Sequence, residues 1–187
     1  MEIDYSLLTD RVVRTRNYFK VRNIPKLRSL SNDYTRDLLV YQDSLFLDLS
    51  LATLVICNVL EKPRFWKYDD WLKTVFKLEE KLDVCITQAK AKDMRSLKNT
   101  LDIIIELASS VDEKDRRFVE NIITHGRVKI GSTLYAQGLS IGRAAEISGV
   151  SKEKIFQYSG KTLINDRFGK TMSIKERLNN VKSIFRN

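Results

Sequence analysis

Apolar residues recur at helical spacing along the first 110 residues, and no segment alternates apolar and polar positions as a strand does. A first helix is predicted over residues 3–22, before Pro25. A long second helix is predicted from about Asn32 to Pro63; its middle is apolar on most faces, so it should be the most buried element. Helices over 68–92 and 94–110 carry apolar stripes, namely Trp71, Val75, Leu78, Leu82 and Ile86 in one and Leu97, Leu101, Ile104 and Leu107 in the other.

This pattern predicts an all-α fold with an up-down bundle of four helices in residues 1–110. All seven glycines fall between Gly126 and Gly169, so the chain changes character near residue 111 and a second domain is expected over 111–187. Its first helix should start near Asp112 and Glu113 and bury Phe118, Val119, Ile122 and Ile123. We expect Gly126 to separate it from a shorter helix, 127–137, that Gly138 stops.

Residues 139–162 predict two short helices joined by a tight turn. Ser140 can cap the first helix and Ser151 the second, because a serine hydroxyl accepts hydrogen bonds from the free N–H groups of a first turn. Gly149 supplies the positive φ that the turn needs. This arrangement is the helix-turn-helix unit. Its predicted core is Ala144, Ala145, Gly149, Val150, Ile155 and Tyr158, and Ser148 departs from the larger apolar residue usual at its position.

The stretch LSIGRAAEISGVSKEKIFQY resembles the helix-turn-helix segment of small prokaryotic, often archaeal, DNA-binding proteins, in particular antitoxin-type proteins paired with PIN-domain toxins. The resemblance covers roughly residues 127–187. It implies DNA binding and an antitoxin-like or repressor role. The chain departs from that group in carrying more than 110 residues of helical domain in front.

If the second helix enters the major groove, its outward residues read bases and neighbouring cations contact phosphates. Gln157 can bond adenine, Lys152 can reach guanine and Glu153 can accept from cytosine. The base-reading set is Ser151, Lys152, Glu153, Phe156, Gln157 and Lys161, and the phosphate set is Arg127, Lys129, Arg143 and Lys154.

After a loop around Gly169, the chain predicts a terminal amphipathic helix. A capping box joins Ser173 and Glu176. The apolar stripe of this helix is Ile174, Leu178, Val181 and Phe185. Either it docks on its own domain or it mediates dimerisation or partner binding.

Composition supports a soluble cytoplasmic protein with a basic carboxyl-terminal part. The chain is 43% hydrophobic and 30% charged, with a net charge of +9. Residues 1–110 account for +2 and residues 111–187 for +7, which is the footprint of a phosphate-binding surface. The longest uncharged run, 49–60, is too short to span a bilayer, and no signal peptide is expected. Cys57 and Cys85 should be buried free thiols.

Enzymatic chemistry, a metal site and a cofactor are not expected. The single histidine, His125, has no neighbouring nucleophile, and no glycine-rich phosphate loop is present. Glu79 and Glu80 are interleaved with lysines as on a solvated helix face.

The basic segment 11–28 has two interpretations. It contains seven Lys and Arg and no acid, with Tyr18 and Phe19 among them. It can bind nucleic acid through stacking and charge, or it can offset the acidic stretch Asp33–Asp48 inside the bundle. The second interpretation is slightly favoured.

The sequence therefore predicts a DNA-binding protein, a transcriptional regulator or antitoxin-like repressor, whose bundle dimerises or binds a partner such as a toxin. Exposed Trp or Phe residues in the bundle would mark that surface. Two alternatives are a protein-interaction module with a structural helix-turn-helix, and an RNA-binding protein that uses residues 11–28.

Overall fold

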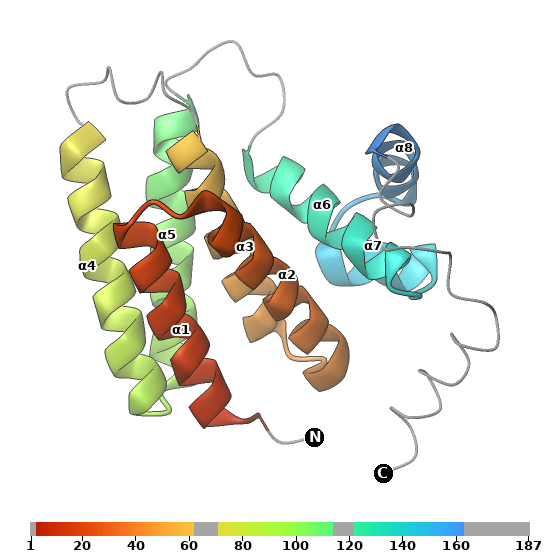
Figure 1. The fold of residues 1–187 in the computed structure, drawn as a ribbon. Helices are drawn as coiled ribbons and strands as arrows, with labels where there is room; N and C mark the ends of the chain where they lie inside the picture. Colours follow the sequence, from red (N-terminus) through yellow and green to blue (C-terminus); the bar gives the residue numbers. More distant parts are fainter. Residues whose placement is uncertain (1–2, 62–70, 114–121, 163–187) are drawn as a thin grey trace. The chain divides into compact units, whose positions relative to one another are not determined.

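The computed structural model describes residues 3–61, 71–113 and 122–162. These residues form eight α-helices and no strand (Figure 1), so the all-α prediction is confirmed for the part of the chain described. Two compact units, residues 1–126 and 127–187, make up the chain. The helical bundle of the first unit is confirmed, and the division of function between the units stays a prediction.

The bundle contains five helices: α1 (Tyr5–Lys20), α2 (Ile24–Tyr41), α3 (Ser44–Glu61), α4 (Trp71–Lys90) and α5 (Met94–Glu113). Helix α3 packs against α2 and α5, and α4 packs against α5 and α1 (Figure 1). Nearly every residue of α3 is buried, as its uniformly apolar sequence predicts.

The predicted continuous helix from Asn32 to Pro63 is wrong, because the chain reverses between α2 and α3. Gln42 takes the left-handed conformation (φ 52°), and the Asp43 carboxylate accepts a hydrogen bond from the Leu45 N–H at 2.8 Å. A straight helix over that range would be about 48 Å long. The reversal instead packs α3 against α2, where the Ser50 hydroxyl lies 2.8 Å from the Thr35 hydroxyl. The bundle consequently has five helices rather than four.

The predicted core stripes are confirmed at most positions. Leu78, Leu82, Leu97, Leu101 and Ile104 are all buried. Val75, Ile86 and Leu107 are half-buried, and Cys85 takes the inward place expected for Ile86. Cys57 and Cys85 are both buried free thiols, as predicted.

Two predicted helix ends in the carboxyl-terminal part are wrong. Asp112 and Glu113 lie in the last turn of α5, so the helix start predicted at these two residues is wrong, and α6 (Ile122–Ala136) runs unbroken through Gly126. A Cβ on Gly126 would lie 2.8 Å from Leu51 Cδ1, so this glycine permits close packing and does not end a helix. Gly138, with φ 110°, follows the end of α6 as predicted. The predicted Phe118 and Val119 face, the loop around Gly169 and the helix of 173–185 lie outside the described residues.

Candidate nucleic-acid interface

The carboxyl-terminal unit contains α7 (Ile141–Ser148) and α8 (Lys152–Thr162), here called the α7–α8 pair, joined by Gly149, Val150 and Ser151. The Ser140 hydroxyl accepts a hydrogen bond from the Arg143 N–H at 3.2 Å and caps α7, as predicted. Gly149 has φ 67°, and its N–H donates to the Ala145 carbonyl at 2.9 Å. The Ser151 hydroxyl accepts from the Lys154 N–H at 3.4 Å. Both helix starts and the turn are therefore fixed by local side-chain and backbone chemistry.

The predicted core residues differ in depth. Ala144 and Ile155 are fully buried, whereas Ala145, Val150 and Tyr158 are half-buried and Gly149 is exposed. Burial of Ile155 fixes which side of α8 faces inward and so which side is open.

Ser148 is buried where a larger apolar side chain would be usual, and the reason lies in α6. A Cβ on Gly131 would lie 2.6 Å from Ser148 Oγ and 2.9 Å from Ile155 Cδ1. The Ser148 hydroxyl donates to the Ala144 carbonyl at 2.6 Å, so this small polar side chain is satisfied within its own helix. Gly131 and Ser148 together let the helices approach closely. Sequence reasoning missed this contact between Gly131 and Ser148. Its only signal was that both residues are small, and they lie 17 positions apart in the chain.

The open side of α8 carries Glu153, Phe156 and Gln157 of the predicted base-reading set, and Ser151 and Lys152 are exposed where the helix begins. Glu153 and Gln157 are exposed. Phe156 is 65% exposed, so it does not pack into the unit. Lys161 lies within α8, but its side chain is outside the described residues.

Glu153 stays charged in this setting. Its pKa is lowered by a hydrogen bond from its own backbone N–H, by the Ser151 hydroxyl and by the charge of Lys152. A carboxylate can accept from the cytosine amino group and repels phosphate. It is therefore suited to reading a base edge.

The four predicted phosphate ligands have different surroundings. Arg143 and Lys154 are exposed, and Arg143 pairs with Glu146 at 2.8 Å on its own helix. Lys129 is half-buried. Arg127 is also half-buried, and its guanidinium donates to the Ser148 carbonyl at 3.2 Å. This bond places its charge at the carboxyl-terminal end of α7, where a cation stabilises a helix, so Arg127 holds the turn.

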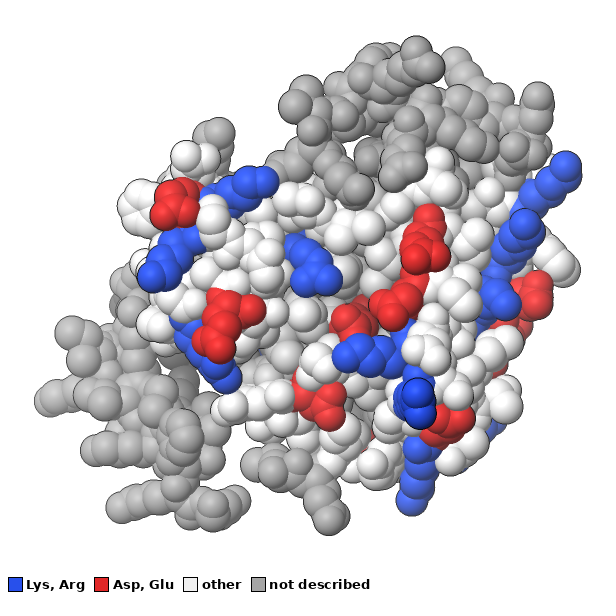
Figure 2. All heavy atoms as spheres, turned by 180° about the vertical axis from the view of Figure 1, so that it is seen from behind, with Lys and Arg blue, Asp and Glu red and all other residues white. Residues whose placement is uncertain are grey.

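Charge is strongly divided between the two units. Residues 127–187 carry 12 Lys+Arg against 4 Asp+Glu, a net +8 of the chain's +9. On the face shown in Figure 2, Lys and Arg side chains alternate with Asp and Glu. The described Lys and Arg residues on that face form no single basic field.

Four of the seven cations of the basic segment 11–28 pair with carboxylates in the bundle. Arg11 pairs with Asp37, and Arg16 binds the Asp83 carboxylate at 2.7 and 3.2 Å. This hydrogen bond raises the pKa of Arg16. Arg14 pairs with Asp10 and Arg28 with Glu61. The interpretation that this segment offsets the acidic stretch Asp33–Asp48 holds for Arg11, because Asp37 lies in that stretch. The other three arginines pair with carboxylates outside it.

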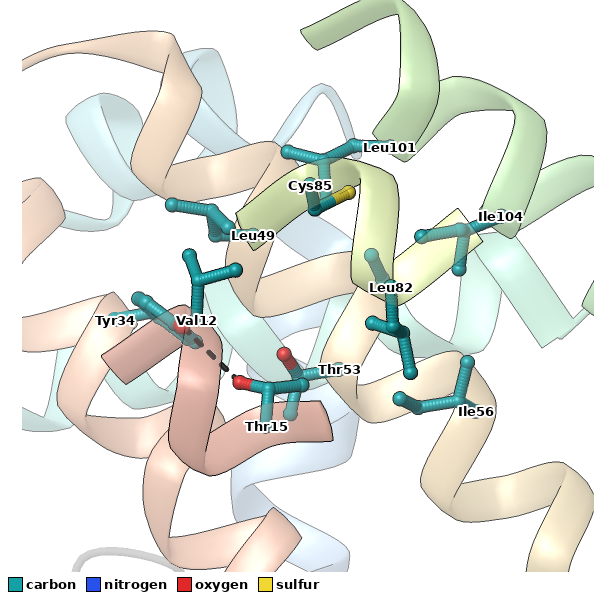
Figure 3. Close-up of a pocket in the computed structure, with 11 residues that line it drawn as sticks. Val12, Thr15, Tyr34, Leu49, Thr53, Ile56, Leu82, Cys85, Leu101 and Ile104 are labelled. Carbon is teal, nitrogen blue, oxygen red and sulfur yellow. Dashed lines mark hydrogen bonds between the residues drawn. The ribbon is translucent and has the colours of Figure 1, made fainter. Parts of the chain in front are cut away.

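A small cavity lies at the centre of the bundle (Figure 3). Its volume is about 10 Å³, which holds about one water. Apolar side chains surround the hydrogen bond between the Thr15 and Tyr34 hydroxyls, 3.1 Å long. Burial raises the pKa of Tyr34 and raises that of Cys85 to about 12, so both stay neutral. This space is too small for an organic ligand.

Other candidate chemistry is sparse among the described residues. His125 is exposed, and no cluster of three or more His, Cys, Asp or Glu suited to a metal ion occurs in them. Helix α3 is long and apolar enough to cross a membrane, and 83% of it is buried within the protein.

The chain matches no protein-family model, no curated protein and no solved structure. The resemblance to antitoxin-type proteins therefore stays a prediction that rests on the motif in residues 127–187.

Proposed function

We propose that the chain binds duplex DNA through the α7–α8 pair, acting as a helix-turn-helix, and regulates transcription at the sites it occupies. One observation carries this proposal. Helix α8 buries Ile155 while Glu153, Phe156 and Gln157 are exposed on its other side, and Lys152 is exposed in its first turn beside α7. A helix is about 10–12 Å across and the major groove is about 12 Å wide, so an open helix face of this kind can enter it.

The exposed side chains supply a reading set with distinct chemistry. Gln157 matches the donor and acceptor of adenine, Lys152 the acceptors of guanine, and Glu153 the amino group of cytosine. Phe156 offers an apolar surface for the thymine methyl group. Four different contacts on one helix suit sequence-specific recognition rather than general affinity for nucleic acid.

Phosphate contacts would come from Lys129 in α6, Arg143 in α7 and Lys154 in the first turn of α8. The net +8 of residues 127–187 favours a polyanion, and neutralising phosphates releases counterions, so affinity should fall steeply with salt. Arg127 contributes by holding the turn through the Ser148 carbonyl.

The alternative of RNA binding through residues 11–28 has less support. Arg11 and Arg16 pair with carboxylates and their side chains are only 18% and 23% exposed, so a phosphate would have to displace those two pairs. The pairs of Arg14 and Arg28 are as exposed as that of Arg143. The protein-interaction alternative is favoured by a different observation, the exposed Phe76 of α4. An antitoxin-like repressor would combine DNA binding with that second role.

A binding titration tests the proposal. A duplex selected from a random pool is titrated at two salt concentrations with the wild-type chain and with Lys152→Ala/Gln157→Ala. A good base contact contributes about 1–3 kcal/mol, so the double variant should lose at least about tenfold in affinity for that duplex and most of its preference over unrelated sequence.

The matched control is Lys90→Ala/Asn99→Ala, which removes the same charge and one amide from exposed positions of the bundle. It should bind like the wild type. Absence of wild-type binding at low salt contradicts the proposal, and so does an equal loss in both double variants.

A further inference from the structure

The side chain of Phe156 is open to solvent although its neighbours in α8 pack inward. It is 65% exposed, and it is the one large apolar side chain that is exposed among the described residues of 127–162. Ile155 beside it is fully buried and already fills the inward place of the helix. A ligand group that covers the ring would gain the free energy of apolar burial.

Glu153 is the neighbour of Phe156 on this open side. The two residues are three positions apart and therefore adjacent on the helix surface. At about 100° and 1.5 Å per residue, they lie about 60° apart around the axis and about 4.5 Å apart along it. Both side chains are exposed. A negatively charged acceptor and an apolar ring are thus presented side by side.

Glu153 keeps capacity to accept further hydrogen bonds. Its carboxylate accepts from its own backbone N–H and from the Ser151 hydroxyl. A carboxylate has about four lone-pair sites, so about two remain for a ligand. The cation that acts on Glu153 is Lys152, whose Cε lies 3.6 Å from the place that a Cβ would take on Gly142 of α7. The lysine side chain therefore extends along α7 rather than across the carboxylate.

This pair of groups matches the major-groove edges of pyrimidines. Cytosine presents an amino donor there, whereas thymine presents an acceptor oxygen beside a methyl group on C5. A carboxylate accepts from the amino group and is repelled by the oxygen, so Glu153 favours cytosine over thymine. Successive bases of a strand are about 3.4 Å apart, close to the separation of about 4.5 Å between the two residues along the helix.

We propose that the duplex read by α8 carries a cytosine whose amino group donates to Glu153 and, next to it on the same strand, a pyrimidine whose C5 methyl group packs against Phe156. That methyl group belongs to a thymine or to a 5-methylcytosine, since both bases carry it at the same ring position. The inference rests on the proposed function, because it requires α8 to lie in the major groove, and it adds the base step that is recognised.

Two single-base changes in the DNA test this inference. A duplex selected from a random pool by the wild-type chain is titrated after each thymine in turn is replaced by deoxyuridine, which lacks only the methyl group. One such change should weaken wild-type binding about fourfold, the effect of burying one methyl group, and should not affect Phe156→Ala. Replacing each cytosine in turn by 5-methylcytosine tests the other source of the methyl group. A gain of similar size, absent in Phe156→Ala, would assign the contact to 5-methylcytosine.

Phe76→Ala is the matched control, because it removes the same side chain from α4, where it is 70% exposed. It should respond to both base changes as the wild type does. Glu153→Gln tests the other half of the step and should lose the preference for cytosine beside the methyl-sensitive position.

The outcomes separate this inference from the function on which it rests. A wild-type chain that binds the selected duplex but responds to neither base change overturns the methyl contact and leaves the proposed function standing. Equal responses of the wild type and Phe156→Ala also overturn it. A wild-type chain that binds no duplex at low salt overturns both.

Discussion

The close approach of α6 to the α7–α8 pair gives the sharpest test of how the smaller unit is built. Gly131→Ala places a methyl group 2.6 Å from Ser148 Oγ, 2.9 Å from Ile155 Cδ1 and 3.1 Å from Ser148 Cβ. The hydroxyl is held by its bond to the Ala144 carbonyl, and Ser148 Cβ moves only with the helix backbone. The new methyl therefore forces the helices apart.

Gly160→Ala supplies the reference for this change. Gly160 lies in α8, and a Cβ at this position would have no neighbouring atom within 4 Å. Replacing a helical glycine by alanine favours the helix by up to about 1 kcal/mol, and this gain is broadly common to both variants. Overpacking a filled core costs about 1–3 kcal/mol. The free energy of local opening of α7 and α8 should consequently be about 1–3 kcal/mol lower in Gly131→Ala than in Gly160→Ala.

The measurement has to report on residues 127–162 alone. Both tryptophans of the chain, Trp66 and Trp71, lie in the first unit, so their fluorescence does not follow the second. Amide hydrogen exchange in α7 and α8 does, because the exchange rate of a protected amide reflects local opening. Each 1.4 kcal/mol changes that rate about tenfold, so the amides of α7 and α8 should exchange roughly 5- to 140-fold faster in Gly131→Ala than in Gly160→Ala.

Equal exchange rates in the two variants would refute the close approach. A second check is Ile155→Val, which removes the Cδ1 atom that the new methyl meets. Its cost should be smaller in the Gly131→Ala background than alone, because residues in contact are not additive. Additive costs would show that Gly131 and Ile155 do not touch.

Two further predictions concern ionisable groups. Cys85 should react with a thiol reagent at pH 8 only when the protein unfolds, because a buried thiol with a pKa near 12 has almost no thiolate. Labelling followed by absorbance should be slow in buffer and fast in urea. Fast labelling in buffer would contradict the burial of this thiol. Ser151→Ala should raise the pKa of Glu153, followed by carboxyl NMR, by removing a hydrogen bond to the carboxylate. Because the pKa of Glu153 is lowered in the folded protein, its carboxylate stabilises the fold above the ordinary pKa of 4.5, and this contribution is lost as the pH falls through the folded pKa. An unchanged titration of Glu153 in Ser151→Ala would exclude the Ser151 hydrogen bond as a cause of the shift.

Local chemistry determined much of this protein from its sequence. The periodic apolar stripes of α4 and α5 predicted helices and most of their buried residues, since a helix brings every third or fourth residue to one side. Ser140 and Ser151 predicted helix starts, Gly138 predicted a helix end, and Gly149 predicted positive φ. These features depend on a few consecutive residues, so they can be read without knowing what packs against them.

Contacts between distant residues decided the rest. Gly126 and Gly131 sit inside α6 because side chains from other helices, Leu51 and Ser148, leave no room for a Cβ. The reversal at Gln42 is favoured because α3 gains a partner in α2, which no window of sequence reveals. The ion pairs of segment 11–28 likewise depend on distant carboxylates; Asp83, for example, is 67 positions away from its partner Arg16. The sequence of a helix determines which side chains it can present to a neighbour, and only tertiary packing determines which atoms come into contact. The reason is that the steric and electrostatic energies that select one helical arrangement act between residues far apart in the chain.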